Sequence, residues 1–101
     1  MKREEIIKQL GGIVLKNIDL SNISASDELI KLNEERDEFE KAIYEYLVNP
    51  TEENRNNVIE EYFDEVQSAL GYMEKTTGIT ADEAMRRYYL HEEKIKKRPR
   101  V

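Results

Sequence analysis

Residues 26–48 read SDELIKLNEERDEFEKAIYEYLV, and residues 51–77 read TEENRNNVIEEYFDEVQSALGYMEKTT. In both stretches apolar residues recur at intervals of three and four, which is the spacing of one face of an α-helix. The spacing predicts two long helices, one over 27–48 and one from 52 to about 76. The apolar positions of these helices are Leu29, Leu32, Phe39, Ala42, Ile43, Tyr46 and Leu47 in the first, and Ile59, Tyr62, Phe63, Val66, Leu70 and Met73 in the second.

Residues with known preferences for helix ends flank both stretches. Ser26 and Thr51 are the predicted N-caps, and each is followed by acidic residues that the helix dipole favours in the first turn. Pro50 ends the first helix, because the residue before a proline is pushed out of the helical conformation. Gly78 is the expected C-terminal residue after the second helix.

A third helix is predicted from residue 80 to about residue 97. Thr80 and Glu83 form a Thr-x-x-Glu capping box at its start, and Pro99 lies beyond its end. A short helix over residues 2–10 is also predicted, ended by Gly11 and Gly12. The apolar positions of the third helix are Ala84, Met85, Tyr88 and Ile95.

These elements predict an all-α fold. Short linkers make the two long helices antiparallel neighbours in a bundle with the third helix and the short N-terminal helix. A chain of 101 residues builds only a modest core, so we expect oligomerisation to complete the bundle. The expected organisation is an N-terminal segment, 1–25, a helical domain, 26–98, and a tail, 99–101.

Composition and charge narrow the class of protein. The chain has no cysteine, which excludes disulfides and thiolate metal sites. Its net charge of −6 argues against binding a nucleic acid polymer. Residues 94–101, KIKKRPRV, are nevertheless strongly basic. No apolar run is long enough for a membrane span, and the first ten residues lack the apolar core of a signal peptide. The expected location is the cytoplasm.

Two pairs of acidic residues stand out in the long helices. Glu35 and Glu38 lie in the first helix, and Glu61 and Asp64 in the second. Residues three apart share a helix face, so antiparallel packing would bring four carboxylates together. Like charges this close are unfavourable without a cation. Carboxylate oxygens suit a hard ion such as Mg²⁺, with Mn²⁺ as an alternative.

Helical phase distinguishes the two pairs. At about 100° per residue, Glu35 and Glu38 fall on the apolar stripe of their helix. The strongest apolar stripe of the second helix centres near 150° from Glu61, which fits a helix contacted on two sides. The simpler alternative stays open: in a chain with 22 acidic residues, such pairs also arise as solvated faces.

The pattern Glu35-x-x-Glu38, a spacer of 22 residues, and Glu61-x-x-Asp64 resembles the EXXE…EXXD signature of the MazG-like all-α nucleoside triphosphate pyrophosphohydrolases. Residues 31–43 and 58–80 are similar to the two motif helices of that family, and the resemblance spans about 29–98. His91, Lys94 and Arg98 resemble the basic end of some small members.

The resemblance implies an enzyme that cleaves the α–β phosphoanhydride of an NTP or dNTP to a monophosphate and pyrophosphate. The four motif acids would bind Mg²⁺, and Glu34 or Glu60 would orient or deprotonate the attacking water. It further implies a homodimer or homotetramer with sites near the interface. The side chains expected to hold substrate phosphate are Lys94, Lys97, Arg98 and His91.

Alternative interpretations remain at each of these positions. The basic tail also fits a solvated helix end, and His91 a surface or capping residue. Tyr72 shares a face with Glu61 and is the best candidate for stacking on a base, although core packing explains it equally well. The rival function is a non-enzymatic helical interaction or regulatory module whose acidic faces are simply solvated.

Overall fold

The structure is a computed structural model, and it describes residues 19–98. This range contains helices and no strand, so the predicted all-α fold is confirmed. The predicted helix over 2–10, with the rest of segment 1–18, and the tail 99–101 lie outside the described residues. The helices are α2 (Ala25–Val48), α3 (Glu52–Thr77), α4 (Ala81–Arg86) and α5 (Tyr88–Lys97).

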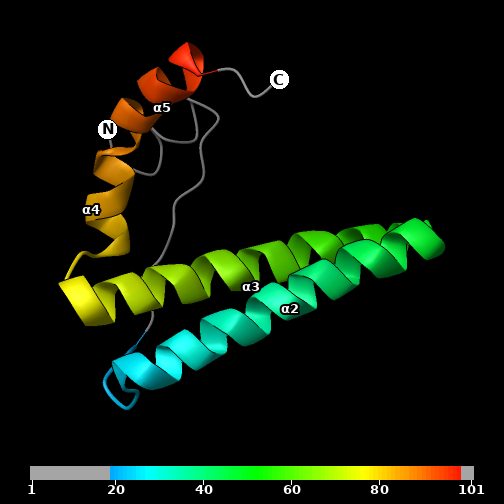
Figure 1. Ribbon diagram of the computed structural model, residues 1–101, viewed down its shortest axis with the longest axis horizontal. Coiled ribbons are helices and arrows are strands. Elements are labelled where there is room, and N and C mark those ends of the chain that lie inside the picture. Colours follow the sequence, from blue (N-terminus) through cyan, green and yellow to red (C-terminus); the bar gives the residue numbers. More distant parts are fainter. Residues whose placement is uncertain (1–18, 99–101) are drawn as a thin grey trace, which may run out of the picture.

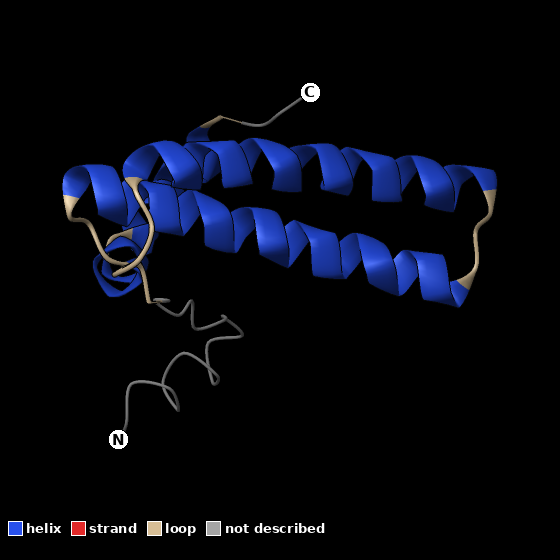
Figure 2. Ribbon diagram, turned by 90° about the horizontal axis from the view of Figure 1, so that it is seen from below, coloured by secondary structure: helices blue, strands red, loops and turns tan. Residues whose placement is uncertain are grey.

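The two long helices form an antiparallel pair, as the short linker predicted. α2 and α3 lie side by side and are joined by residues 49–51 (Figure 1; Figure 2). We call this pair the hairpin. α4 and α5 rise away from the end of the hairpin opposite that loop, and neither runs alongside α2 or α3 (Figure 1). We call α4, α5 and Arg98 the arm.

The helix caps explain where the hairpin begins and ends. Ser24, rather than the predicted Ser26, caps α2: its hydroxyl accepts a hydrogen bond from the backbone N–H of Asp27 at 3.1 Å. Ser26 lies inside the first turn, because Ser24 is the residue that keeps an extended backbone. Thr51 caps α3 as predicted. Gly78 adopts the left-handed conformation, with φ 78°, that a helix C-terminus favours in glycine.

The predicted third helix is divided in two. Thr80 caps α4 as expected, accepting from the N–H of Glu83 at 3.2 Å. At Arg87, however, the backbone leaves helical geometry, with φ −97° and ψ 0°, and α5 starts anew at Tyr88. The prediction of a single helix from residue 80 to about residue 97 is therefore wrong. Aromatic residues such as Tyr88 and Tyr89 are weaker helix formers than alanine or leucine, and no long packed face holds the arm straight.

Small and acidic residues line the contact between α2 and α3. Glu28, Glu35 and Ala42 are the buried residues of α2, each seven positions after the last, and Ser68 and Gly71 are those of α3. Seven residues are nearly two helical turns and three are nearly one, so each set forms one line along its helix. The contact is therefore narrow and partly polar.

Several residues predicted for the core are exposed in the single chain. Among the described residues, no large side chain is fully buried. Small and acidic residues occupy most of the contact, so many of the predicted core side chains lie at its margins or outside it. The exposed members of the predicted core are Leu29, Leu47, Ile59, Tyr62, Phe63, Tyr88 and Ile95.

Candidate metal centre

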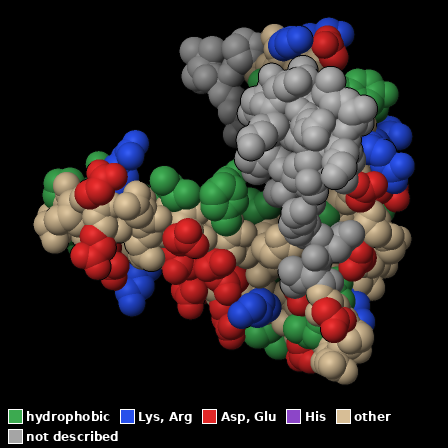
Figure 3. All heavy atoms as spheres, turned by 180° about the vertical axis from the view of Figure 1, so that it is seen from behind, with side chains coloured by type: hydrophobic (Ala, Val, Ile, Leu, Met, Phe, Trp, Pro, Cys, Tyr) green, Lys and Arg blue, Asp and Glu red, His purple; other side chains and the backbone are tan. Residues whose placement is uncertain are grey.

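Three of the four motif acids meet midway along the hairpin. Glu35 and Glu38 lie one turn apart on α2, and Glu61 faces them from α3. One carboxylate oxygen from each lies within 4.8 Å of the other two. Figure 3 shows acidic side chains gathered over this part of the hairpin. We call these three residues the acidic centre.

Two oxygens of the acidic centre are buried without a hydrogen-bond donor among the described residues. They are Oε2 of Glu35 and Oε2 of Glu61. Glu35 is only 9% exposed, and its other oxygen, Oε1, lies 3.4 Å from Nζ of Lys31. A buried carboxylate oxygen without a donor is unfavourable. A cation placed between the three carboxylates would remove this cost.

The electrostatics of Glu61 follow from the same crowding. Burial raises the pKa of Glu61, and the negative charges of Glu38, Asp64 and Glu35 raise it further. A side-chain hydrogen bond with Glu38 acts in the same direction. A proton therefore relieves the repulsion in the protein alone. A divalent cation would relieve it more completely, because it interacts with all three carboxylates at once.

Asp64, the fourth motif acid, lies beside the acidic centre rather than within it. It is exposed and does not belong to the group of oxygens within 4.8 Å. Its charge nevertheless raises the pKa of Glu61, which lies one turn earlier on α3. Of the four predicted metal ligands, three converge, and Asp64 lies beside them.

Helical phase places the two candidate water-activating residues on the same side of the hairpin. Glu34 lies about 40° from Glu38 around α2, and Glu60 lies about 40° from Asp64 around α3. Both are exposed. They can therefore face solvent above the acidic centre without belonging to it.

An ion pair joins the two helices next to the acidic centre. Nε of Arg36 donates a hydrogen bond to Oε1 of Glu65 at 3.5 Å. The rings of Phe39 and Tyr62 are 5.9 Å apart, centroid to centroid, and also join α2 to α3. Sequence reasoning missed the ion pair, since its partners are 29 positions apart.

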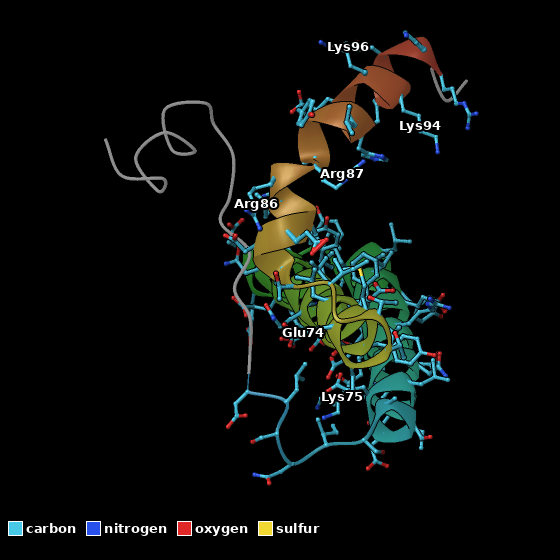
Figure 4. The ribbon with its side chains drawn as sticks, turned by 90° about the vertical axis from the view of Figure 1, so that its left-hand side faces the viewer. Glu74, Lys75, Arg86, Arg87, Lys94 and Lys96 are labelled. Atoms are coloured by element: carbon cyan, nitrogen blue, oxygen red, sulfur yellow. The ribbon has the colours of Figure 1, made fainter. Side chains whose placement is uncertain are left out.

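The predicted phosphate-binding residues lie on the arm, away from the acidic centre. Lys94, Lys97, Arg98 and His91 are all exposed, and the ring of His91 lies 5.7 Å from that of Tyr88. Figure 4 shows Lys94 and Lys96 on α5, far along the arm from Lys75 near the end of α3. Within one chain, the acidic and basic residues of the predicted site are therefore not brought together.

Tyr72, the candidate for base stacking, is half-buried on α3. It follows Glu61 by eleven residues, or about 16 Å along the helix axis. Tyr72 and the acidic centre share a helix face but are three turns apart.

Comparisons with known proteins found no match to this chain. The chain matches no protein-family model, no curated protein and no solved structure.

Sequence reasoning also missed a buried acid outside the acidic centre. Glu28 is 3% exposed, and its Oε2 has no hydrogen-bond partner among the described residues. This oxygen lies 2.9 Å from the position that a Cβ atom on Gly71 would take. The spacing of Glu28 seven residues before Glu35, opposite the one glycine of α3, was the available signal.

Within residues 19–98, no helix combines the length and apolar character of a membrane span.

Proposed function

We propose that this chain is a Mg²⁺-dependent nucleotide pyrophosphohydrolase of the MazG-like type. One observation carries the proposal. Glu35, Glu38 and Glu61, which occupy three of the four acidic positions of the EXXE…EXXD pattern, converge within 4.8 Å and include two buried oxygens without donors. Glu38 is exposed, but a carboxylate oxygen buried without a donor is unfavourable, so the two buried oxygens of Glu35 and Glu61 favour a cation over a solvated acidic face.

The donor set fits a hard divalent cation. The acidic centre offers only carboxylate oxygens, the ligand type that suits Mg²⁺ or Mn²⁺. Asp64, exposed and one turn from Glu61, would complete the set. When bound, Mg²⁺ would neutralise charge on the phosphate groups and lower the pKa of water.

The other residues of the hairpin would act on substrate and water. Glu34 or Glu60, exposed on the same side as Glu38 and Asp64, would orient the attacking water and accept its proton. Attack on the α–β linkage of an NTP or dNTP would release a monophosphate and pyrophosphate. Lys94, Lys97, Arg98 and His91 would hold the phosphates, and Tyr72 would contact the base. A nucleotide substrate and a chain without cysteine fit the cytoplasm.

Pyrophosphate release from a panel of NTPs and dNTPs with Mg²⁺ tests the proposal. We expect pyrophosphate rather than orthophosphate from at least one nucleotide. Glu38→Gln should reduce this release by about 100-fold or more, since it removes a metal ligand while keeping the side chain's size. Glu40→Gln is the matched control, because Glu40 is exposed on the same helix and lies outside the acidic centre.

A second function is favoured by the exposed apolar side chains of the hairpin and arm. These suit a helical interaction or regulatory module. The two functions differ in their response to Mg²⁺, which would stabilise the enzyme and leave the module unchanged. No pyrophosphate from any nucleotide, together with no thermal stabilisation by Mg²⁺, would favour the module.

A further inference from the structure

One basic side chain lies directly against the acidic centre. Nζ of Lys31 is 3.4 Å from Oε1 of Glu35, one helical turn further along α2. The side chain of Lys31 is 55% exposed, whereas that of Glu35 is 11% exposed. Lys31 belongs neither to the four motif acids nor to the basic tail. Its ammonium group therefore touches the acidic centre and still reaches solvent.

Helical phase places Lys31 on the exposed side of the acidic centre. At about 100° per residue, Lys31 lies about 20° from Glu38 and about 60° from Glu34 around α2. Glu38 and Glu34 are both exposed. Lys31 thus borders the face from which a substrate phosphate would approach a cation held by the three carboxylates.

Two other basic residues of the hairpin are engaged elsewhere. Arg36 lies about 160° from Glu38 around α2, and its Nε donates to Oε1 of Glu65 at 3.5 Å. Lys75 lies in the last turn of α3 (Figure 4), where its Nζ donates to the backbone carbonyl of Leu20 at 2.9 Å. Neither residue is placed to meet a phosphate group at the acidic centre.

The last two basic residues of the hairpin point away from the contact between its helices. Lys41 lies about 120° from Glu35 around α2, and Arg55 lies about 120° from Glu61 around α3. Both are exposed. Lys31, only about 40° from Glu35, is therefore the basic residue that the hairpin places at its acidic centre.

The negative charge of the hairpin favours a role for a cationic side chain beside the bound metal. Ala25–Thr77 carries fifteen acidic and five basic residues, and such a surface repels a polyphosphate. One Mg²⁺ offsets two of the three negative charges of the acidic centre. The arm begins beyond the end of α3, which lies sixteen residues, or about 24 Å, past Glu61. A phosphate group at the centre therefore gains most from an ammonium group on the hairpin itself.

The ion pair between Lys31 and Glu35 can be exchanged for another partner. An exposed lysine that pairs with a glutamate four residues away gains little from the contact. A divalent cation bound by Glu35 would repel an ammonium group held 3.4 Å from the same carboxylate. The flexible lysine side chain can then turn toward a neighbouring anion.

We propose that Lys31 exchanges Glu35 for a phosphate oxygen of the substrate when the cation and the nucleotide bind at the acidic centre. The inference deepens the proposed function and rests on it. In the protein alone, Lys31 pairs with a metal ligand, whereas in the complex it donates to the phosphate groups. Removing its charge should therefore strengthen binding of the cation alone and weaken binding of the phosphate.

Calorimetric titration with Mg²⁺ alone tests the first half of the exchange. Lys31→Gln should bind Mg²⁺ about 2-fold more tightly than the wild type, because the competing ammonium group is gone. Arg55→Gln is the matched control, since it removes one positive charge from the hairpin away from the acidic centre, and it should leave the Kd unchanged. A Kd for Mg²⁺ that Lys31→Gln leaves unchanged or raises would overturn the exchange.

Steady-state kinetics tests the second half. With a nucleotide that the wild type hydrolyses, Lys31→Gln should raise KM about 10-fold and leave kcat within about 2-fold, since a lost contact to phosphate weakens the ground state and the transition state alike. Lys31→Arg keeps the charge and should restore KM to within about 3-fold of the wild type. An unchanged KM in an active Lys31→Gln variant would overturn the inference and leave the proposed function standing.

Binding of inorganic tripolyphosphate with Mg²⁺ separates the inference from the reaction. The wild type should bind this probe, and Lys31→Gln should raise its Kd about 10-fold, whereas Arg55→Gln should not. This pattern in a protein that hydrolyses no nucleotide would refute the proposed function and keep the inference. No binding by the wild type, or an equal loss in the two variants, would overturn the inference. Far-UV circular dichroism checks that both variants keep their helices.

Discussion

The hairpin and the arm are built from similar helical sequence but are stabilised differently. α2 and α3 bury a shared line of side chains, from Glu28 to Ala42 on one helix and including Ser68 and Gly71 on the other. α5 has no buried residue. The arm has good local signals, including a capped start and basic residues in its last turn. The difference shows that local signals produce helices, whereas tertiary contact decides which of them resist unfolding.

The largest expected effect is thermal stabilisation by a divalent cation. This stabilisation should depend on acidic residues of the hairpin and not on basic residues of the arm. Millimolar Mg²⁺ should raise the Tm of the wild-type protein, because a ligand present at 100 times its Kd adds about 2.7 kcal/mol to the free energy of unfolding. Glu61→Gln should abolish this increase. Lys94→Gln, on the arm, should keep it. Scanning calorimetry with Mg²⁺ and with EDTA measures both, and equal loss in the two variants would refute a cation site in the hairpin.

The next effect probes the contact between Gly71 of α3 and Glu28 of α2. Gly71→Val should lower the free energy of unfolding by about 1–3 kcal/mol through overpacking, since its Cβ would lie 2.9 Å from Oε2 of Glu28 and 3.4 Å from Cδ2 of Leu20. Urea titration gives the value. Ala69→Val, at an exposed position two residues earlier, should cost no more than about 0.7 kcal/mol of helix propensity. Similar losses for both would mean that the helices do not approach closely here.

Two equivalent helix caps allow a direct comparison of the two regions. The hydroxyls of Thr51 and Thr80 accept backbone hydrogen bonds at 3.1 and 3.2 Å, respectively. Thr51→Ala should lower the free energy of global unfolding by about 1 kcal/mol. Thr80→Ala should instead weaken hydrogen-exchange protection in α4 alone, because Ala81 is the one buried residue of the described arm and we expect the arm to open independently of the hairpin. A global loss from Thr80→Ala would show that the arm folds together with the hairpin.

A smaller effect concerns the ion pair between α2 and α3. Arg36→Gln removes the contact with Glu65 and should cost about 0.2–1 kcal/mol, since the side chain of Arg36 is 57% exposed. The cost should shrink in high salt as the charges are screened. Chemical denaturation at low and high ionic strength measures both values. A loss that does not depend on salt would assign the effect to packing of the arginine stem.

The smallest expected effect is a dependence of stability on pH. The raised pKa of Glu61 means that the folded chain binds this proton more tightly than the unfolded chain does. Its contribution is therefore full below the ordinary glutamate pKa and is lost as the pH rises through the raised value. In EDTA, Tm should fall over this range in the wild type, and the Glu61→Gln variant should fall less. Identical pH profiles would contradict the assigned electrostatics.

The sequence predicted where most helices begin and end better than it predicted which side chains are buried. Thr51, Thr80 and Gly78 marked helix ends correctly, because capping depends on a few neighbouring residues. Ser24, and not the predicted Ser26, caps α2, because Ser24 is the residue that keeps an extended backbone and accepts from the N–H of Asp27. Arg87 divided the third helix without any glycine or proline to signal a break.

For the site, sequence alone placed Glu35 and Glu38 on one face of a helix, because three residues make nearly one turn. It also indicated, through the second motif, that Glu61 belongs with them. What only the tertiary structure decided was the convergence itself: the packing of α2 on α3 brings Glu61 to the pair, leaves Asp64 beside it and directs the arm elsewhere. Helical periodicity is a local property of the chain, whereas contacts between distant residues depend on the relative position and alignment of whole helices. That is why Glu28 against Gly71 and Arg36 against Glu65 could be seen only after the helices were packed.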